Sequence, residues 1–490
     1  MRFGASAVAE RGPELLVAVG LMVIAAGLLH VLPDAIEQDT WLALVDGRLV
    51  AQHGIPHHVT LIAFAHGRPW VDQQWLAQLW MYWLYRAGGM ALLGVVNVGL
   101  VTSAILAAIV ASRRLGASTG SVIRVLPLAA FGVAAALEVR TQPYAYPLAV
   151  AVMFLLARDS RQPSRAVYWC LPLLILWANV HGSATLGAGL VVLRGLTSLW
   201  ERRRALAREP RAWLHGLVLI AAPTLCLLAT PYGTAAVSYY RATLLEGNLS
   251  RFVTEWQPVT TLPVVAVPFF LLAAITVWSF GRHAGRTTVF ERCALLVLAA
   301  GAIIALRNVV WFSLATLIVL PVSIDLAVRS HARSRSQGGA RTPLNLALVA
   351  AAAILLVVEL GQATARSPSS LEPLYPDGAL AQVRNAVDAG GSTRVYADER
   401  FADWLLWRLP QLRGRVAYDA SFELLSTAQL QAIYDLKSHA GDDWDRAARG
   451  YRLLVLDSSA DALVRAFQRE PGTRRLFGRD GAVVLERPVG

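Results

Sequence analysis

The strongest constraint on this chain is a series of apolar runs that lie close together along most of its length. A membrane-spanning helix needs roughly 20 consecutive, mainly apolar residues, and eleven runs near this length are predicted as spans. Backbone groups find no water inside a bilayer, so such segments must be helical. The sequence therefore predicts a polytopic α-helical membrane protein. The predicted spans are residues 14–32, 91–111, 122–138, 143–158, 167–182, 184–200, 213–230, 263–280, 289–306, 309–328 and 344–361.

The distribution of charge predicts how these spans are oriented. The chain has a formal net charge of +12, although only 16% of its residues are charged. Arginines gather in every second loop, as in Arg113-Arg114 and in the loop 158–165, whereas acidic residues gather in the loops between. Cytoplasmic loops carry an excess of Lys and Arg. We therefore expect a cytoplasmic N-terminus and an extracytoplasmic first loop, and the distribution argues against a nucleic-acid-binding surface.

The first outer loop, residues 33–75, carries two clusters of candidate functional residues. Its opening places Asp34, Glu37 and Asp39 within six positions, which is costly beside a membrane helix unless they face water, a cation or a polar ligand. Carboxylates one residue apart can bind a hard divalent cation, or one of them can act as general base on a hydroxyl. The alternative is that they are ordinary solvated acids. The second cluster closes the loop with Asp72, Gln74 and Trp75.

Polar motifs at the outer ends of later spans give further candidates. Asn179 and His181 need partners inside an apolar helix, which favours a ligand site over a polar pair that only packs helices. Glu138 and Arg140 form either a ligand site or an interfacial ion pair. Arg307 lies between two apolar runs, where its guanidinium suits a phosphate unless it simply extends to the membrane surface.

Glu255, in the outer loop 231–263, is the weakest of these candidates. After residue 361 the composition becomes charged and mixed, which predicts a linker over 362–377 and an extracytoplasmic α/β domain over 378–490. Within this domain we expect strands at 393–397, 415–418, 452–456 and 482–486, and helices at 379–387, 427–439 and 460–468. Two amphipathic helices are also expected in the first outer loop, at 40–53 and at 71–86, the second at the membrane interface.

Several of these motifs resemble a known superfamily. They are Glu37-Gln38-Asp39-Thr40-Trp41, His53-Gly54-Ile55-Pro56, Pro69-Trp70-Val71-Asp72-Gln73-Gln74-Trp75-Leu76, Trp177-Ala178-Asn179-Val180-His181-Gly182 and Pro231-Tyr232-Gly233. An acid-x-acid motif directly after the first span resembles the GT-C superfamily of integral-membrane glycosyltransferases. More narrowly, the chain resembles bacterial members with a C-terminal extracytoplasmic domain. It differs from their pattern at Ala43, where they have histidine, and at Gln74, where they have glutamate.

The resemblance implies a GT-C-like transmembrane domain over 1–361, with the outer loop 33–90 carrying the acidic motif, in a bacterial plasma membrane. Asp39 would deprotonate or orient the acceptor hydroxyl, and Glu37 would assist it or join it in binding Mg²⁺ or Mn²⁺. Glu138 matches a family acid by position only, whereas Arg140 and Arg307 are assigned to a lipid phosphate from charge and depth.

The implied activity is an inverting transfer of a hexose or pentose. The donor would be a polyprenyl-phosphate-linked sugar, and the acceptor a cell-envelope glycan, lipid or protein. Two alternatives remain open at this point: a transporter or flippase for a lipid-linked glycan, and a catalytically silent scaffold for envelope biogenesis.

Overall fold

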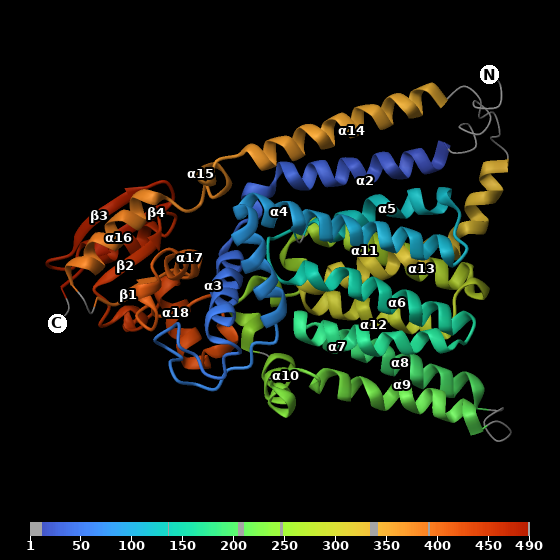
Figure 1. Cartoon of the computed structure of the whole chain (residues 1–490), viewed down its shortest axis with the longest axis horizontal. Coiled ribbons are helices and arrows are strands. Elements are labelled where there is room, and N and C mark those ends of the chain that lie inside the picture. The colour runs from blue at the N-terminus through green and yellow to red at the C-terminus, as the bar shows by residue number, and fades with distance from the viewer. Residues whose placement is uncertain are drawn as a thin grey trace.

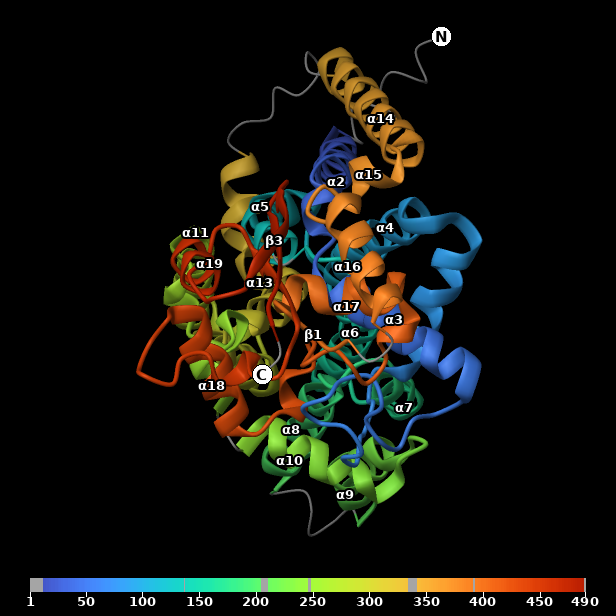
Figure 2. The same ribbon diagram turned by 90° about the vertical axis from the view of Figure 1, so that its left-hand side faces the viewer.

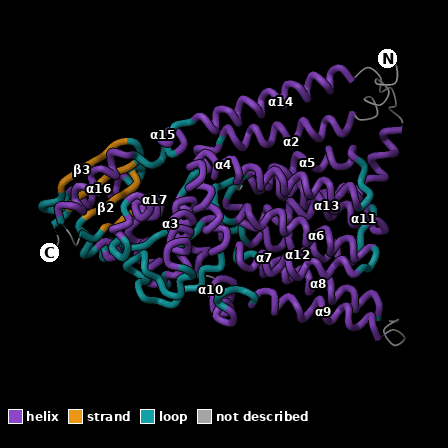
Figure 3. Tube along the Cα trace, viewed as in Figure 1, coloured by secondary structure: helices purple, strands orange, loops and turns teal. Residues whose placement is uncertain are grey.

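The computed structural model consists of a bundle of long helices with a small α/β domain at one end (Figure 1). It describes residues 12–135, 137–203, 210–245, 248–333, 342–390 and 393–488. Figure 3 shows that the strands belong to the C-terminal domain, and Figure 2 looks onto this domain where it stands over the ends of the bundle helices. The predicted domain boundaries, 1–361, 362–377 and 378–490, stay predictions.

A helix lies at each of the eleven predicted spans, which confirms the predicted fold class. These helices are α2 (Gly12–His30), α4 (Trp75–Arg114), α5 (Thr119–Ala134), α6 (Tyr146–Arg161), α7 (Cys170–Val180), α8 (Ala184–Arg202), α9 (Pro210–Leu228), α11 (Pro263–Arg282), α12 (Val289–Ile304), α13 (Val309–Arg333) and α14 (Thr342–Ala365). Within the described residues, five helical segments are individually long and apolar enough to cross a membrane. Helix α9 and the following α10 (Ala236–Leu245), bent by 102°, form a sixth if they count as one span.

The first outer loop folds into two helices that turn across the end of the bundle. Helix α3 (Gln38–His53) corresponds to the first predicted amphipathic helix, and Figure 1 shows it running across the direction of the long helices. The second begins at Trp75 and is the first part of α4. The backbone leaves helical geometry at Gly88 and Gly89, where φ is −152° and 66°, so the outer part of α4 is separated from the span that follows.

Helix α3 and the outer part of α4 cross at Gly47. A side chain at this position would meet the carbonyl group of Gln78 and would lie 2.9 Å from the Cβ of Tyr82. Beside this crossing, the amide of Gln78 donates a hydrogen bond of 3.2 Å to the buried carboxylate of Asp46. Only glycine allows so close an approach of the two helices, so this residue fixes where α3 lies.

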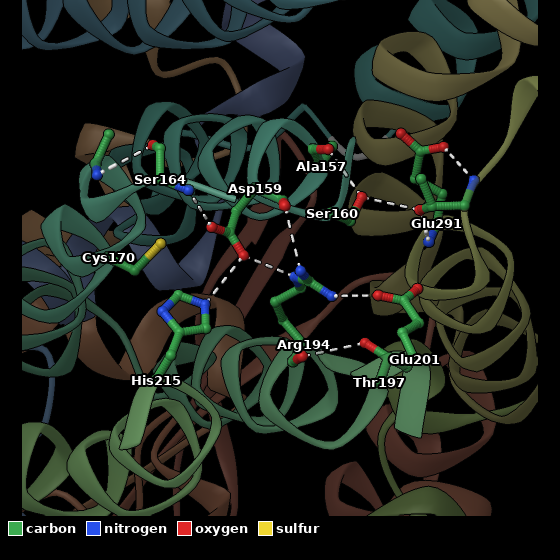
Figure 4. Close-up of polar contacts among 12 residues, drawn as sticks. Ala157, Asp159, Ser160, Ser164, Cys170, Arg194, Thr197, Glu201, His215 and Glu291 are labelled. Atoms are coloured by element: carbon green, nitrogen blue, oxygen red, sulfur yellow. Dashed lines mark hydrogen bonds and ion pairs between the residues drawn. The ribbon is translucent and has the colours of Figure 1, made fainter. Parts of the chain in front are cut away.

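A buried ion pair fastens three helices at the opposite end of the bundle (Figure 4). The Nε of Arg194 in α8 lies 2.8 Å from the Oδ2 of Asp159 in α6, and both side chains are almost fully buried. Glu201 accepts from the same guanidinium at 3.1 Å, and the Nε2 of His215 in α9 lies 3.4 Å from Asp159. Each charge has a partner, as a buried ion pair requires.

The C-terminal domain contains a four-stranded sheet in the order β1-β2-β4-β3. Its strands are β1 (Val395–Ala397), β2 (Leu453–Asp457), β3 (Arg474–Arg479) and β4 (Ala482–Glu486), and its main helices are α16 (Asp377–Ala389), α17 (Glu399–Arg408), α18 (Thr427–Ser438) and α19 (Asp461–Gln468). β1 and β2 are parallel, whereas β4 is antiparallel to both β2 and β3. Strands β1, β2 and β4 are buried and coincide with predicted strands, but the arginine-rich β3 and α17 were not predicted.

The predicted strand 415–418 is corrected to a single extended connection. The backbone of Val416 makes isolated bridges to Val395 on one side and to Ile62 of the first outer loop on the other. Its carbonyl accepts from the backbone N–H of Ala63 at 2.8 Å, and the N–H of Gly414 donates to the carbonyl of Leu61 at 2.7 Å. The outer loop thus continues the sheet beyond β1, and it ties the α/β domain to the membrane domain.

Helix α3 also holds the α/β domain through Arg48. Its guanidinium donates to the backbone carbonyls of Leu406 and Trp407, at 2.7 and 2.9 Å, and lies 4.6 Å from the centre of the Trp407 ring. These carbonyls belong to the last turn of α17, where helical carbonyls lack partners within the helix and a cation is favoured. Helix α3 is therefore packed between the bundle and the α/β domain.

The crossing at Gly47 generates a stability prediction. We expect Gly47→Ala to destabilise the protein by about 1–3 kcal/mol, because the added methyl group has no space between the helices. Gly27→Ala in α2 is the matched control, since nothing lies within 4 Å of the added Cβ, and a helical alanine is slightly favoured over glycine. Thermal unfolding in nanodiscs measures both. Equal unfolding midpoints for the two variants would contradict the crossing.

Candidate active site

A cavity of about 960 Å³ lies where the end of the bundle that carries α3 meets the α/β domain. Side chains of α3 and of the outer loops line its charged end. One side continues as an apolar groove between α8 and α12, and the α/β domain forms the opposite wall. Its lining includes eight of the eleven predicted site residues, namely Glu37, Asp39, Gln74, Glu138, Arg140, His181, Glu255 and Arg307.

The backbone around Arg140 is fixed before its side chain makes any contact. The N–H of Val139 donates to the carbonyl of Ala35 at 2.8 Å, and the hydroxyl of Thr40 in α3 donates to the carbonyl of Val139 at 2.7 Å. The carbonyl of Arg140 accepts from the amide of Asn97 at 3.4 Å. This segment is thus hydrogen-bonded to both α3 and α4, which points Arg140 into the cavity.

Three carboxylates converge on one nitrogen of Arg140. Its Nη1 lies 2.8 Å from Glu255 Oε2, 3.0 Å from Glu138 Oε2 and 3.4 Å from Asp39 Oδ2. The Arg140 side chain is only 10% exposed, whereas that of Asp39 is 33% exposed. Of the three acids, Asp39 is therefore the one most open to a molecule in the cavity.

Burial and neighbouring charges shift the pKa values of these three acids in different directions. Burial raises the pKa of Asp39, and the charge of Arg140 partly offsets this effect. Burial together with the nearby Asp39 raises the pKa of Glu138 well above its ordinary value. Burial would also raise the pKa of Glu255, but Arg307 and Arg140 outweigh it and lower the pKa to about 2. Glu255 is therefore ionised at physiological pH, and Asp39 is a stronger base than an exposed aspartate.

Arg307 is a second cation on the cavity wall. It lies in a short turn, Leu306–Asn308, between α12 and α13, and the N–H of Leu306 donates to the carbonyl of Gln257 at 2.9 Å. Its Nη1 lies 3.2 Å from Glu255 Oε1, and its guanidinium stacks 4.5 Å from the centre of the Trp256 ring. Because Arg307 is 21% exposed and shares its single carboxylate with Arg140, it is more available than Arg140 to an incoming anion.

Three predicted site residues do not line the cavity. The amide of Asn179 donates to the carbonyls of Ile175 and Ala229, and its oxygen accepts from the indole of Trp75 at 3.0 Å. These bonds join the end of α7 to α4 and α9, so both residues serve helix packing. Asp72 is buried, and its carboxylate accepts from the N–H of Gln74 at the start of α4.

His181 and Gln74 do reach the cavity, each with a protein partner. The Nδ1 of His181 lies 2.7 Å from the hydroxyl of Ser183. The hydroxyl of Thr141 donates to Gln74, so the residue that departs from the family pattern supports the segment of Arg140. Ala43, the other departure, is buried in α3 and does not line the cavity.

The residues that line the two other walls of the cavity were not predicted from the sequence. The groove is lined from α8 and α12 by residues that include Leu186, Gly189, Leu190, Leu193, Leu196 and Val297. The α/β domain contributes Glu399, Phe422, Glu423, Tyr434 and Lys437, the only lysine of the chain. Lys437 forms an ion pair with Glu399. In the sequence, the apolar residues of the groove cannot be told from residues that face lipid. At the wall formed by the α/β domain, the one unusual sequence feature was Lys437, because lysine is otherwise absent from the chain.

The site does not fit the divalent cation that the family resemblance implies. Within the part of the chain that the structure describes, no group of three or more His, Cys, Asp or Glu side chains is arranged to hold a metal ion. Asp39 is one of the two residues proposed to bind the cation, and its Oδ2 faces the guanidinium of Arg140. Arg140 occupies the centre on which the carboxylates converge.

Comparisons with known proteins identify the fold. No family model and no curated protein matches the sequence. Among solved structures, the chain is similar to the oligosaccharyltransferase AglB of Archaeoglobus fulgidus in complex with an inhibitory peptide and a dolichol-phosphate, with a TM-score of 0.55 and 12% identity over 96% of this chain and 74% of that one. It is also similar to ArnT of Cupriavidus metallidurans bound to undecaprenyl phosphate, with a TM-score of 0.52 and 13% identity over 94% and 97% of the two chains.

Proposed function

We propose that this chain, a membrane protein with the fold of the GT-C superfamily of glycosyltransferases, transfers a sugar from a polyprenyl-phosphate carrier to a hydroxyl acceptor on the extracytoplasmic face. The observation that carries this proposal is a single cavity that joins an apolar groove to a partly exposed arginine, Arg307, and a partly exposed carboxylate, Asp39. The alternating arginine loops support the sidedness, and we place the protein in a bacterial plasma membrane.

The groove between α8 and α12 supports a lipid-linked donor. Its walls are apolar, and it ends at the charged part of the cavity near Arg307. A polyprenyl chain would bury apolar surface along the groove while its phosphate pairs with the partly exposed guanidinium of Arg307, whose fork suits phosphate oxygens. ArnT and AglB, which share the fold, were solved with undecaprenyl phosphate and dolichol-phosphate, respectively.

The chemistry we propose is a single displacement at the anomeric carbon. The acceptor oxygen attacks this carbon and forms the new glycosidic bond, while the bond to the phosphate oxygen breaks and the electron pair leaves with the lipid phosphate. Asp39 accepts the proton of the acceptor hydroxyl, and Arg307 stabilises the charge on the leaving phosphate. One displacement inverts the anomeric configuration. Glu37, beside Asp39 on the cavity wall, assists in orienting the acceptor.

The α/β domain supports an acceptor that carries hydroxyl groups. Its wall combines the aromatic rings of Phe422 and Tyr434 with the charged groups of Glu423 and Lys437. Burial raises the pKa of Glu423 to about 7, so this carboxyl can both donate and accept hydrogen bonds near neutral pH. Aromatic faces next to such groups suit a sugar ring. The acceptor class we propose is a cell-envelope glycan or glycolipid.

If the groove binds the polyprenyl chain, a bulky side chain placed in the groove should weaken lipid binding. Gly189 of α8 lines the cavity with open space beside it, so Gly189→Trp should weaken undecaprenyl phosphate binding at least about tenfold. Displacing about two methylene groups, at about 0.8 kcal/mol each, is sufficient for this loss. Gly99→Trp in α4 is the control, because Gly99 also has open space but does not line the cavity. Native mass spectrometry in nanodiscs measures binding, and equal affinity of the two variants would contradict the groove.

The base assignment predicts the effect of Asp39→Asn. The substitution preserves shape but cannot accept the proton, so transfer should fall by about 10²–10⁴-fold. The assay uses proteoliposomes with undecaprenyl-phosphate-linked hexoses and pentoses, envelope lipid extract as acceptor, and release of undecaprenyl phosphate as the readout. Asp34→Asn, at an exposed acid of the same loop outside the cavity lining, should leave the rate unchanged.

Full activity of Asp39→Asn would contradict the proposed mechanism. Movement of a labelled lipid-linked sugar across the vesicle membrane without formation of a glycosidic bond would instead identify a flippase. If Asp39→Asn has no effect in cells while deletion of residues 378–490 matches deletion of the whole gene, the protein is a scaffold.

A further inference from the structure

The surroundings of Arg140 resemble the coordination sphere of a cation. Three carboxylate oxygens, from Asp39, Glu138 and Glu255, lie within 3.4 Å of the single atom Nη1. Hard divalent cations are held in proteins by oxygen ligands, of which carboxylates are the commonest charged kind. In this chain a side-chain nitrogen lies where such an ion would neutralise the three acids.

Arg140 is built into this position. Its side chain is 10% exposed, and the backbone carbonyls of Val139 and of Arg140 itself are hydrogen-bonded to α3 and α4, respectively. Burial alone would lower the pKa of Arg140, but Glu255, Glu138 and Asp39 outweigh it and raise the pKa well above its ordinary value. The guanidinium therefore remains charged at any physiological pH, and it cannot leave without exposing the carboxylates to one another.

We infer that the guanidinium of Arg140 takes the place of a divalent cation, so that this site operates without a bound metal ion. Arg140 is then a positioning residue: it supplies the fixed charge that holds Asp39 and Glu255 in place. Arg307 is left to contact the anion that enters the cavity. The role of Arg140 in sugar transfer rests on the proposed function. Its position at the centre of the carboxylate cage, which is formed by Asp39, Glu138 and Glu255, does not.

A vacated cage should behave differently from the native one. Without the guanidinium, three carboxylates would share a small buried volume, and their repulsion would favour a small hard cation at the centre. Arg307 contacts only Glu255 of the three acids. Removing Arg307 should therefore leave the cage filled by Arg140, which makes it the matched control among the cavity arginines.

The test is a titration with Mn²⁺ alone, read by electron paramagnetic resonance, on the full chain in phosphatidylcholine nanodiscs. Wild type and Arg307→Gln should show no stoichiometric Mn²⁺ site. Arg140→Ala should gain one site per chain, with affinity at least about tenfold above the nonspecific background. Arg140→Gln is the second variant, because its amide still donates to a carboxylate and supports the fold if alanine does not. Donor and acceptor are absent, so this test and the transfer assay can fail separately.

Two results would overturn the inference. The first is one Mn²⁺ bound per wild-type chain and lost in Asp39→Asn, because the native site would then hold a metal beside Arg140. The second is a folded Arg140→Gln or Arg140→Ala variant that binds no Mn²⁺, because the three carboxylates would then not form a cage. If neither variant folds, the wild-type titration alone decides, and absence of a stoichiometric site supports the inference.

Discussion

The ion-pair cluster around Arg140 is the interaction on which the end of the bundle beside the α/β domain depends. It brings together Asp39 from α3, Glu138 from the segment after α5 and Glu255 from the loop before α11. Glu255 also forms an ion pair with Arg307, which lies between α12 and α13. Elements separated by more than 200 residues thus meet at one buried charge. Removing Arg140 would leave three carboxylates without the cation that they share, and a buried charge without a partner is costly.

The position of α3 follows from a second constraint, close packing on both of its faces. Gly47 lets it approach α4, and Arg48, the next residue, holds the last turn of α17. Because Asp39 lies at the start of the same helix, the α/β domain is mechanically linked to the proposed base. The backbone bridge between Ile62 and Val416 adds a second connection. This arrangement explains how a domain remote in sequence forms one wall of the cavity.

The sequence predicted the parts of this structure that depend on local patterns. Apolar length and arginine placement located the spans, and charge at the membrane surface singled out Asp39, Arg140 and Arg307 individually. Their convergence could not be predicted, because it depends on how distant loops pack. Asn179 illustrates the opposite case: a polar residue at a helix end predicts a ligand site, but its hydrogen-bonding groups are taken up by helix packing. The groove on α8 carries no polar signal, so only packing reveals it.

The most direct measurement for the account is a cryo-EM map of the protein in nanodiscs with undecaprenyl phosphate added. We expect density for the phosphate within hydrogen-bonding reach of Arg307, density for the polyprenyl chain between α8 and α12, and Arg140 still surrounded by its three carboxylates. A phosphate bound elsewhere on the protein, with the groove empty, would contradict it.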